Sequence, residues 1–356
     1  MNLRVLLGCG LAAALSLPAQ VAAAQEVIKL TVVAGHPPNI AAVEQFIQTF
    51  KPKVAERLQA AGNKYRIEWN EAYSGTIAKP DGVLEAIEQG LGDVGLVPVL
   101  FDAAKLPLEN VTYYTPFGSD DLVVVTRVMQ ELHDKVPAMR KAWERYNQVF
   151  LAGAGIDTYH LITNFPVTKL EDLKGHKIGA PGPAANWVTG TGAVAVGGTL
   201  NTYYNDIKTG VYDGAILYGA SAGAFKIYEV APYFTKVGFG AQYANALTVN
   251  SNAWKKLPAD VRKVFEETAL DWQTKITEAT NQRWERSLEA MTKAGTKITV
   301  LPQEERKKWA AAINNVAKKW ASDQEAKGVP AKAVLSGYMD ALRASGAPVP
   351  RDWDKE

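Results

Sequence analysis

The chain of 356 residues carries 39 lysine and arginine residues against 37 aspartate and glutamate residues, so its net charge is close to neutral. This balance excludes the strongly basic composition that is typical of nucleic-acid-binding proteins. The single cysteine, Cys9, excludes an internal disulfide and a cysteine-ligated metal site.

The first 24 residues have the pattern of a secretory signal peptide. Arg4 supplies a positive charge, residues 5–17 form an apolar run, and three alanines at 22–24 precede Gln25. We expect cleavage after Ala24 and export to the periplasm. The apolar run is shorter than the roughly 20 residues that a membrane-spanning helix needs, and no later run is long enough. Because Cys9 lies in this leader, the mature chain would have no cysteine and would depend on its core for stability.

The mature chain predicts alternating strands and helices over a length that favours two domains. No linker rich in Ser, Gly or Pro separates two halves, which indicates that the chain crosses between the domains more than once. Strands are expected at residues 27–33, 65–69, 94–97, 148–151, 158–163 and 246–249, with Gly153 and Gly155 interrupting the fourth before the fifth. Shorter helices are expected at residues 40–60, 80–88, 120–132, 136–147, 302–324 and 331–344.

Residues 163–217 predict a strand–helix–strand unit. A brief strand at 177–180 is followed by Pro183, which suits the first turn of a helix that would begin near Ala184. Two glycines at 197–198 would end this helix, and a second helix at 204–208 would lead into a strand at 211–216. Ligands favour the carboxyl ends of strands in such units, so we expect the binding site there.

The longest expected element covers residues 258–294. Its apolar residues recur at steps of three and four from Val261 to Met291, Pro258 can begin it, and Gly295 can end it. At about 1.5 Å per residue one unbroken helix would be on the order of 50 Å long, longer than a small domain is wide. Two helices broken near Asn281 are the alternative.

The middle block resembles a known family. Its motif residues are Thr163-Asn164, Pro166, Asp172-Leu173-Lys174-Gly175, Lys177-Ile178 and Pro181, and then Thr209-Gly210-Val211 and Asp213-Gly214-Ala215. Together they resemble the substrate-binding proteins of TRAP (tripartite ATP-independent periplasmic) transporters, and the resemblance extends over essentially the whole mature chain. It implies an α/β, two-domain periplasmic-binding-protein fold, with a ligand cleft between the domains and a single long helix spanning both.

The resemblance also implies a domain division and partners. Domain I would comprise residues 25–156 and 245–284, and domain II residues 157–244 and 285–356. The domains would close on one small-molecule ligand, usually an organic acid, and the protein would deliver it to TRAP membrane subunits that use an ion gradient. We expect a monomer without cofactor or metal.

The sequence departs from the family where the ligand's carboxylate is usually held. Gly179 stands where the family has an arginine after Lys-Ile, and His160 stands at a second arginine position, four residues before Asn164. Ile216 and Leu217 replace a Glu-Asn pair. Neither glycine nor histidine can reproduce the two-point contact of a guanidinium with a carboxylate. Either the acid is held in another way, or the ligand is not a simple acid.

Basic, hydroxyl, amide and aromatic side chains in the expected cleft loops are the candidates for ligand binding. The candidate residues are His36, Tyr73, Lys79, Phe117, His160, Gly179, Pro181, Trp187, Leu217, Tyr218, Tyr243 and Asn245. Free backbone N–H groups at the helix start after Pro183 could bind an anion. Flat aromatic walls with few charges suit an aromatic or 2-oxo acid. The competing interpretations are that His160 and Trp187 are core residues, that Lys79 is a solvated loop residue, and that His36 caps a helix.

One motif favours an enzyme. Residues 219–223 match G-x-S-x-G, which predicts a periplasmic serine esterase with Ser221 as nucleophile. In that class the triad histidine follows the serine, whereas all four histidines of this chain precede Ser221. No catalytic constellation remains, and a binding protein for a neutral solute or for another importer is the further alternative.

Overall fold

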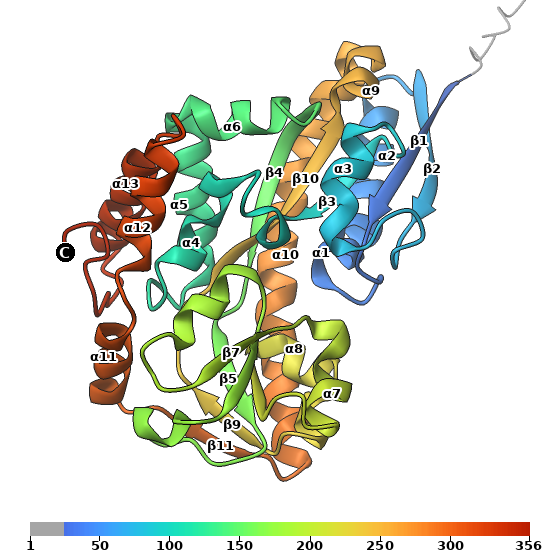
Figure 1. Cartoon of the computed structure of the whole chain (residues 1–356). Coiled ribbons are helices and arrows are strands. Elements are labelled where there is room, and N and C mark those ends of the chain that lie inside the picture. The colour runs from blue at the N-terminus through green and yellow to red at the C-terminus, as the bar shows by residue number, and fades with distance from the viewer. Residues whose placement is uncertain (1–24) are drawn as a thin grey trace, which may run out of the picture.

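Two mixed β-sheets, one in each half of the molecule, organise the fold of residues 25–356, which the computed structural model describes (Figure 1). The expected signal peptide falls on residues 1–24, outside the described residues. The first sheet has the order β2-β1-β3-β10-β4, in which β1 pairs in parallel with β2 and β3, and β10 runs antiparallel to β3 and β4. Its strands are β1 (Glu26–Ala34), β2 (Tyr65–Ala72), β3 (Val94–Pro98), β4 (Gln148–Ile156) and β10 (Gln242–Asn250). We call this half the first lobe.

The second sheet has the order β11-β9-β5-β8-β6-β7 and lies below the first in Figure 1. β5 is antiparallel to both β8 and β9, while β6 is parallel to β7 and β8. Its strands are β5 (Tyr159–Thr163), β6 (Lys177–Ala180), β7 (Val194–Gly197), β8 (Gly214–Tyr218), β9 (Tyr233–Lys236) and β11 (Lys297–Val300). We call this half the second lobe.

Helices cover both sheets. Those before the second lobe are α1 (Ala41–Gln45), α2 (Lys51–Ala60), α3 (Val83–Glu88), α4 (Val111–Tyr114), α5 (Leu122–Lys135) and α6 (Pro137–Glu144). A π-helical turn, Phe46–Phe50, joins α1 to α2, so the expected helix at 40–60 is continuous. The second lobe has α7 (Leu200–Lys208) and α8 (Gly219–Ala224). The remaining helices are α9 (Ser251–Lys256), α10 (Ala259–Lys293), α11 (Gln303–Ala312), α12 (Val316–Glu325) and α13 (Ala331–Ala344).

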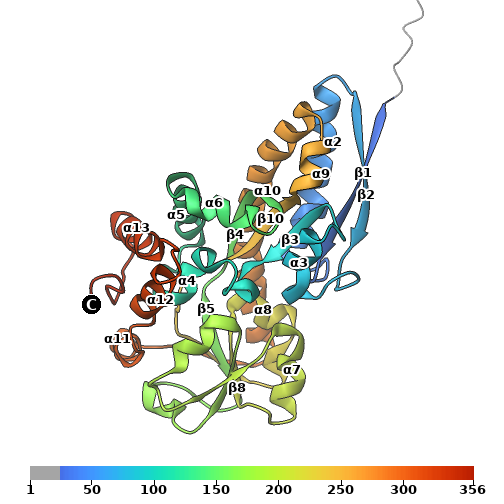
Figure 2. The same cartoon turned by 45° about the horizontal axis from the view of Figure 1, so that its top comes forward.

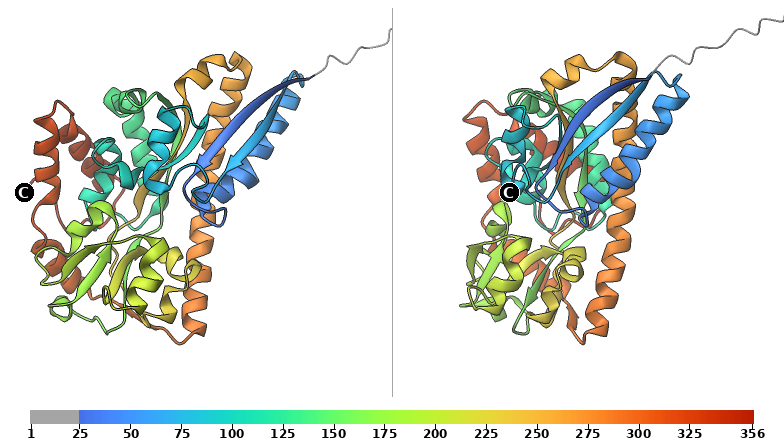
Figure 3. Two further views of the ribbon diagram at one scale, coloured as in Figure 1. Left: turned by 45° about the vertical axis from the view of Figure 1, so that its right-hand side comes forward. Right: turned by 90° about the vertical axis from the view of Figure 1, so that its right-hand side faces the viewer.

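Helix α10 is a single helix of 35 residues, which decides between one helix and two. It packs against α2 and β4 of the first lobe and against α8 of the second, and Figure 3 shows it running along both. Its buried face includes Phe265, Trp272 and Ile276 beside the first lobe. Farther along, Met291 belongs to the core of the second lobe. The stripe of apolar residues therefore serves two different cores in turn.

The chain also crosses between the lobes through residues 157–158 between β4 and β5 and through residues 237–241 between β9 and β10. Short strand-to-strand connections of this kind allow one lobe to rotate relative to the other. The α/β fold with two domains and a helix that spans both is thus confirmed. The two halves cannot be separated at one point of the sequence, in keeping with the absence of a linker.

The last two helices pack on the first lobe. α12 and α13 lie against α4 and α5 in both Figure 1 and Figure 2, and the rings of Trp320 and Tyr114 stack with centroids 5.1 Å apart. The expected division placed these residues in domain II. Their apolar stripes instead cover α4 and α5, so we propose that residues 316–344 belong with the first lobe.

Three local expectations are wrong. The expected helix after Pro183 is a short 3₁₀ segment, Gly182–Val188, followed by β7, because Gly190 and Gly192 have φ values of 81° and 84° that a helix cannot contain. Gly153 and Gly155 do not interrupt β4, which is continuous from Gln148 to Ile156, and Tyr243 packs over Gly153. The region 302–324 is two helices, since the Asn315 side chain accepts from the Lys318 N–H and begins α12.

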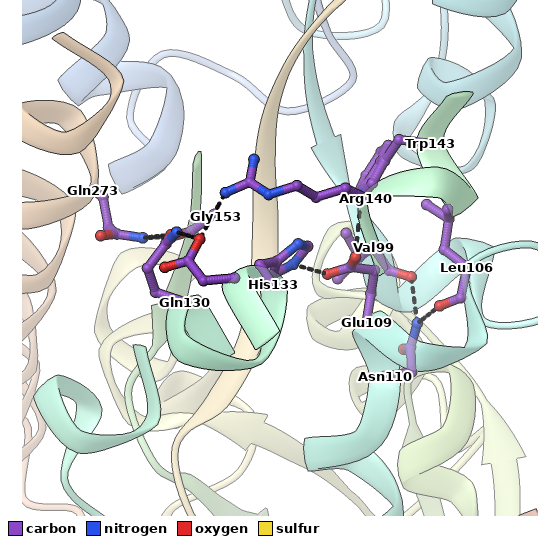
Figure 4. Close-up of polar contacts among 11 residues, drawn as sticks. Val99, Leu106, Glu109, Asn110, Gln130, His133, Arg140, Trp143, Gly153 and Gln273 are labelled. Atoms are coloured by element: carbon purple, nitrogen blue, oxygen red, sulfur yellow. Dashed lines mark hydrogen bonds and ion pairs between the residues drawn. The ribbon is translucent and has the colours of Figure 1, made fainter. Parts of the chain in front are cut away.

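A charged side chain is buried in the first lobe (Figure 4). Glu109 accepts from the Trp143 indole N–H at 2.9 Å, and its other oxygen lies 3.0 Å from Nε2 of His133. All three residues are essentially unexposed, and the His133 ring stacks on Phe150 at 4.0 Å. The three side chains come from different elements, so this cluster ties α5 and α6 to the segment before α4.

Candidate ligand-binding cleft

A cavity of about 520 Å³ lies between the two lobes. It is bounded by the segments that follow β1, β2 and β3 of the first lobe and β6 and β7 of the second, together with the last residues of β8. This is the edge at which α/β sheets bind ligands. The strands next to the crossing segments contribute Ile156 of β4, Tyr159 of β5, and Ala244 and Asn245 of β10. A ligand in the cavity would therefore touch both lobes.

Half of the predicted site residues lie on this cavity. The six are His36, Lys79, Pro181, Leu217, Tyr218 and Asn245. His36, Lys79 and Pro181 lie in the segments that follow β1, β2 and β6, Leu217 and Tyr218 are the last two residues of β8, and Asn245 lies within β10. Their proximity agrees with the expectation for the cleft, while their contacts with a ligand remain predictions.

The other six lie outside the cavity. Trp187 is fully buried, donates its indole N–H to the Tyr113 carbonyl at 2.7 Å and stacks on the Tyr113 ring. His160 accepts from the Gly238 N–H at 3.2 Å, and burial lowers the pKa of its imidazole to about 3. Tyr73, Phe117, Tyr243 and Gly179 are likewise within the packed interior. For His160 and Trp187 the core interpretation describes their surroundings better.

Several cavity residues were not singled out from the sequence. Tyr159 lines the wall at the crossing from β4 to β5, with its hydroxyl 3.4 Å from that of Tyr113. Tyr203 and its neighbours at 199–202 belong to the start of α7. Residues 199–203 could have been found from the turn at Gly197-Gly198, because a helix follows this turn. The first turn of a helix has free backbone N–H groups.

The wall is mostly apolar, and its charged groups are few. Among the described lining residues the charged side chains are Lys79 and Asp81, both exposed, and there is no arginine. His36 also lines the cavity, and burial lowers the pKa of its imidazole to about 4, so it is neutral near pH 7. Aromatic and aliphatic side chains form the rest, among them Leu100, Phe101, Tyr159, Ile216, Leu217 and Tyr218.

An anion could be held at one end of the cavity. Helix α7 begins at Leu200 without a side-chain cap, so its first N–H groups are left for another acceptor. The Lys79 ammonium and the Asn245 amide supply further donors on the same cavity. The helix start that faces the cavity is therefore that of α7, and the one expected after Pro183 is a 3₁₀ turn.

The surroundings of Gly179 leave no room for the arginine that the family has at this position. Gly179 lies in β6 between Val196 and Ala215 of the neighbouring strands. A Cβ atom on this residue would lie 2.8 Å from Cε2 of Tyr212, so the tyrosine ring fills the space a side chain would need. Tyr212 is fixed in turn by a 2.8 Å hydrogen bond to Asp206.

We expect Gly179→Arg to destabilise the protein without improving dicarboxylate binding. Overpacking against Tyr212 should lower the free energy of unfolding by about 1–3 kcal/mol, measured in urea. Gly197→Arg is the matched control, because a Cβ at Gly197 in the adjacent strand would meet nothing within 4 Å. If Gly179→Arg were as stable as this control and bound succinate more tightly than the wild type, the packing argument would be contradicted.

Ser221 lies at the start of α8, and its side chain points back to the end of β8. Its hydroxyl is buried and donates to the Tyr218 carbonyl at 2.5 Å. In the part of the chain that the structure describes, no histidine ring is hydrogen-bonded to Ser221. The G-x-S-x-G motif serves packing instead, because a Cβ at Gly219 or Gly223 would collide with Trp284 or Ser287 of α10.

Residues 25–356 contain no group of three or more His, Cys, Asp or Glu side chains placed to hold a metal ion. No helix in this range is long and apolar enough to cross a membrane.

Two lobes joined by crossing strands, with a mainly apolar cavity between them, define a two-domain solute-binding protein. The chain belongs to the bacterial extracellular solute-binding proteins of family 7, whose family model matches residues 35–324, and the resemblance to TRAP substrate-binding proteins is thereby confirmed. The family and the fold are those of transport proteins.

Relatives and solved structures agree with this membership. The chain is 30% identical over 225 residues to a solute-binding protein of Sulfitobacter sp. (strain NAS-14.1), covering 62% of this chain and 66% of that protein. It is 29% identical over 156 residues to the C4-dicarboxylate-binding periplasmic protein of Rhodobacter capsulatus, covering 43% of this chain and 46% of that protein. Both alignments span less than two thirds of the relative's length.

Solved TRAP solute-binding proteins share the fold at low identity. A marine metagenome protein specific for aromatic acid ligands, in complex with 3-hydroxybenzoate, has a TM-score of 0.78 and 18% identity, covering 90% of this chain and 99% of that one. A Chromohalobacter salexigens protein with bound D-glucuronate has a TM-score of 0.76 and 20% identity, covering 88% and 99%.

Proposed function

We propose that this protein captures a small organic acid, of the aromatic or 2-oxo class, and delivers it to the membrane subunits of a TRAP transporter. The observation that carries this proposal is a cavity of about 520 Å³ with an apolar, aromatic wall and no arginine among its described lining residues. Such a wall suits a planar apolar body better than a short dicarboxylate. Solved proteins with this fold include one with 3-hydroxybenzoate and one from Rhodoferax ferrireducens with benzoate.

The carboxylate of the ligand and its apolar body would contact different residues of the cavity. Its carboxylate would accept hydrogen bonds from Lys79, Asn245 and the first N–H groups of α7, while its ring or chain would pack among Phe101, Tyr159 and Tyr218. Because these residues come from both lobes, a bound ligand would favour the closed arrangement. Export through the leader at residues 1–24 and action as a monomer in the periplasm complete the proposal.

A thermal-shift screen tests the ligand class. The probes are 3-hydroxybenzoate, phenylpyruvate, succinate, D-glucuronate, glucose and an amino-acid mixture. A ligand present at about 100 times its Kd stabilises the folded protein by about 2.7 kcal/mol, so a binder should raise the melting temperature visibly. We expect the aromatic and 2-oxo acids to give the largest shifts. Shifts with succinate alone would refute the aromatic class, and shifts with glucose alone would favour the neutral-solute alternative.

The esterase alternative has its own readout. Turnover of a chromogenic ester by the wild-type protein, lost in Ser221→Ala, would support an enzyme. We expect no turnover and an unchanged ligand-induced shift in Ser221→Ala, because the Ser221 hydroxyl is already bonded to the Tyr218 carbonyl.

A further inference from the structure

His36 occupies a fixed position at the edge of the cavity. It follows the carboxyl end of β1 and precedes Pro37-Pro38, so its backbone has little freedom. Its carbonyl accepts from the Ser74 N–H at 3.1 Å, which ties it to the loop that carries Lys79. The ring therefore faces the cavity from a rigid base and does not swing on a mobile loop.

The His36 ring has no hydrogen-bond partner among residues 25–356, unlike the other histidines. His133 contacts Glu109, His160 accepts from the Gly238 N–H, and His176 contacts Asp213. A partly buried imidazole on a ligand cavity, without a protein partner, has its ring nitrogens available to whatever fills the cavity.

We propose that His36 takes up a proton from solvent when an acidic ligand enters the cleft, and then holds the ligand's carboxylate as an imidazolium. This inference rests on the proposed binding of an organic acid. The step is balanced: hydronium or a buffer acid gives up one proton, an N–H bond forms on the neutral imidazole, and the resulting imidazolium pairs with the carboxylate anion. It would give the cleft a second cation only when the ligand is present.

Burial explains why the proton is absent from His36 before binding, because it lowers the pKa of the free imidazole to about 4. Lys79 on the same cavity offers no opposite charge that would raise this pKa. Asp81 is the one carboxylate among the described residues of the wall, and it is exposed to solvent. Behind the wall, burial raises the pKa of Asp102 to about 7, so its charge is reduced as well. The tyrosine hydroxyls of residues 159, 203 and 218 stay neutral because burial raises the pKa of each.

A bound carboxylate reverses this balance. An opposite charge within about 4–6 Å raises the pKa of a histidine by about 1–3 units. The pKa of His36 is then higher in the complex than in the free protein. The gain in affinity is complete below the free value of about 4 and is lost as the pH rises through the bound value. Affinity should therefore increase as the solution becomes mildly acidic.

Titration calorimetry of the purified protein tests the proton uptake. The probes are 3-hydroxybenzoate, phenylpyruvate and D-glucuronate, each in two buffers of different ionisation enthalpy, from about pH 5 to about pH 8. For the acid that binds, we expect uptake of up to about one proton near pH 5.5, and an affinity about threefold to tenfold higher there than at pH 8.

Two variants separate His36 from general effects of pH. His36→Asn keeps a hydrogen-bond donor but cannot titrate, so its affinity should be weaker and nearly independent of pH. His176→Asn is the control, because His176 lies outside the cavity beside Asp213, and it should keep the wild-type pH profile. As a readout without a variant, the imidazole resonances of wild-type His36 should report protonation on ligand addition at about pH 6.

The outcomes distinguish the two proposals. The proton uptake is refuted if an acid binds without buffer-dependent heat, or if His36→Asn keeps the wild-type pH profile. Either result leaves the acid-binding function intact. If none of the three acids binds at any pH, the proposed function and the proton uptake both fail.

Discussion

Gly35→Ala is expected to weaken ligand binding strongly. A Cβ atom on Gly35 would lie under 3.0 Å from the backbone nitrogen and Cα of Pro80 and from the Lys79 carbonyl carbon. These are backbone atoms, so no side-chain rotation can relieve the overlap, and the loop must move away from β1. That loop carries Lys79, while His36 follows Gly35 directly. The substitution would therefore separate two cavity donors at once.

The loss of ligand affinity and the loss of stability in Gly35→Ala can be measured separately. Loss of a hydrogen bond to a charged group costs about 1.5–3 kcal/mol, so Kd should rise about tenfold to a hundredfold in calorimetry. Overpacking should lower the free energy of unfolding by about 1–3 kcal/mol in urea. Gly197→Ala is the control, since a Cβ there meets nothing within 4 Å and the residue is exposed. Wild-type affinity in Gly35→Ala would show that the position of the 74–81 loop does not matter for binding.

The largest loss of stability is expected from Glu109→Ala. This change removes the acceptor of the buried Trp143 N–H and the partner of His133, and it leaves a cavity between α5, α6 and the segment before α4. Removing one partner of a buried pair typically costs about 3–5 kcal/mol. We expect a shift of that size in urea unfolding, with ligand affinity of the folded fraction little changed because Glu109 lies outside the cavity.

Glu131→Ala on the neighbouring surface is the comparison. Glu131 pairs with Arg127 and Lys135 one turn away on α5, and all three side chains are partly or largely exposed. Exposed pairs of this kind contribute about 0.3–0.5 kcal/mol each. If the free energy of unfolding fell by the same small amount in both variants, the cluster around Glu109 would not stabilise the protein.

The sequence predicted the fold well because its periodicity reflects burial. The stripe of α10 could be followed from Val261 to Met291 even though the two ends of the helix belong to different cores. The expectation of a helix after Ala184 failed because small residues satisfy a helical pattern while Gly190 and Gly192 need positive φ. The partner of the last helices also could not be predicted, since an apolar stripe does not specify the surface it will cover.

The site was predictable where it depends on strand ends. His36, Lys79 and Tyr218 follow from the position of loops after strands. Aromatic residues were less predictable, because a loop tryptophan or tyrosine suits a ligand wall and a domain core equally well. Trp187 and Tyr243 are core residues, whereas Tyr159 lies on the cavity. The difference depends on long-range packing, which local sequence does not encode.

One turn of α10 is held from two sides. Arg283 forms an ion pair with Glu44 of α1 at 2.7 Å, and one turn later the Ser287 hydroxyl donates to the Gly219 carbonyl of α8 at 2.8 Å. This turn of α10 is therefore bonded to both lobes, to the first through Glu44 and to the second through Gly219. A rotation of one lobe relative to the other would have to break one of these two contacts or bend the helix between them.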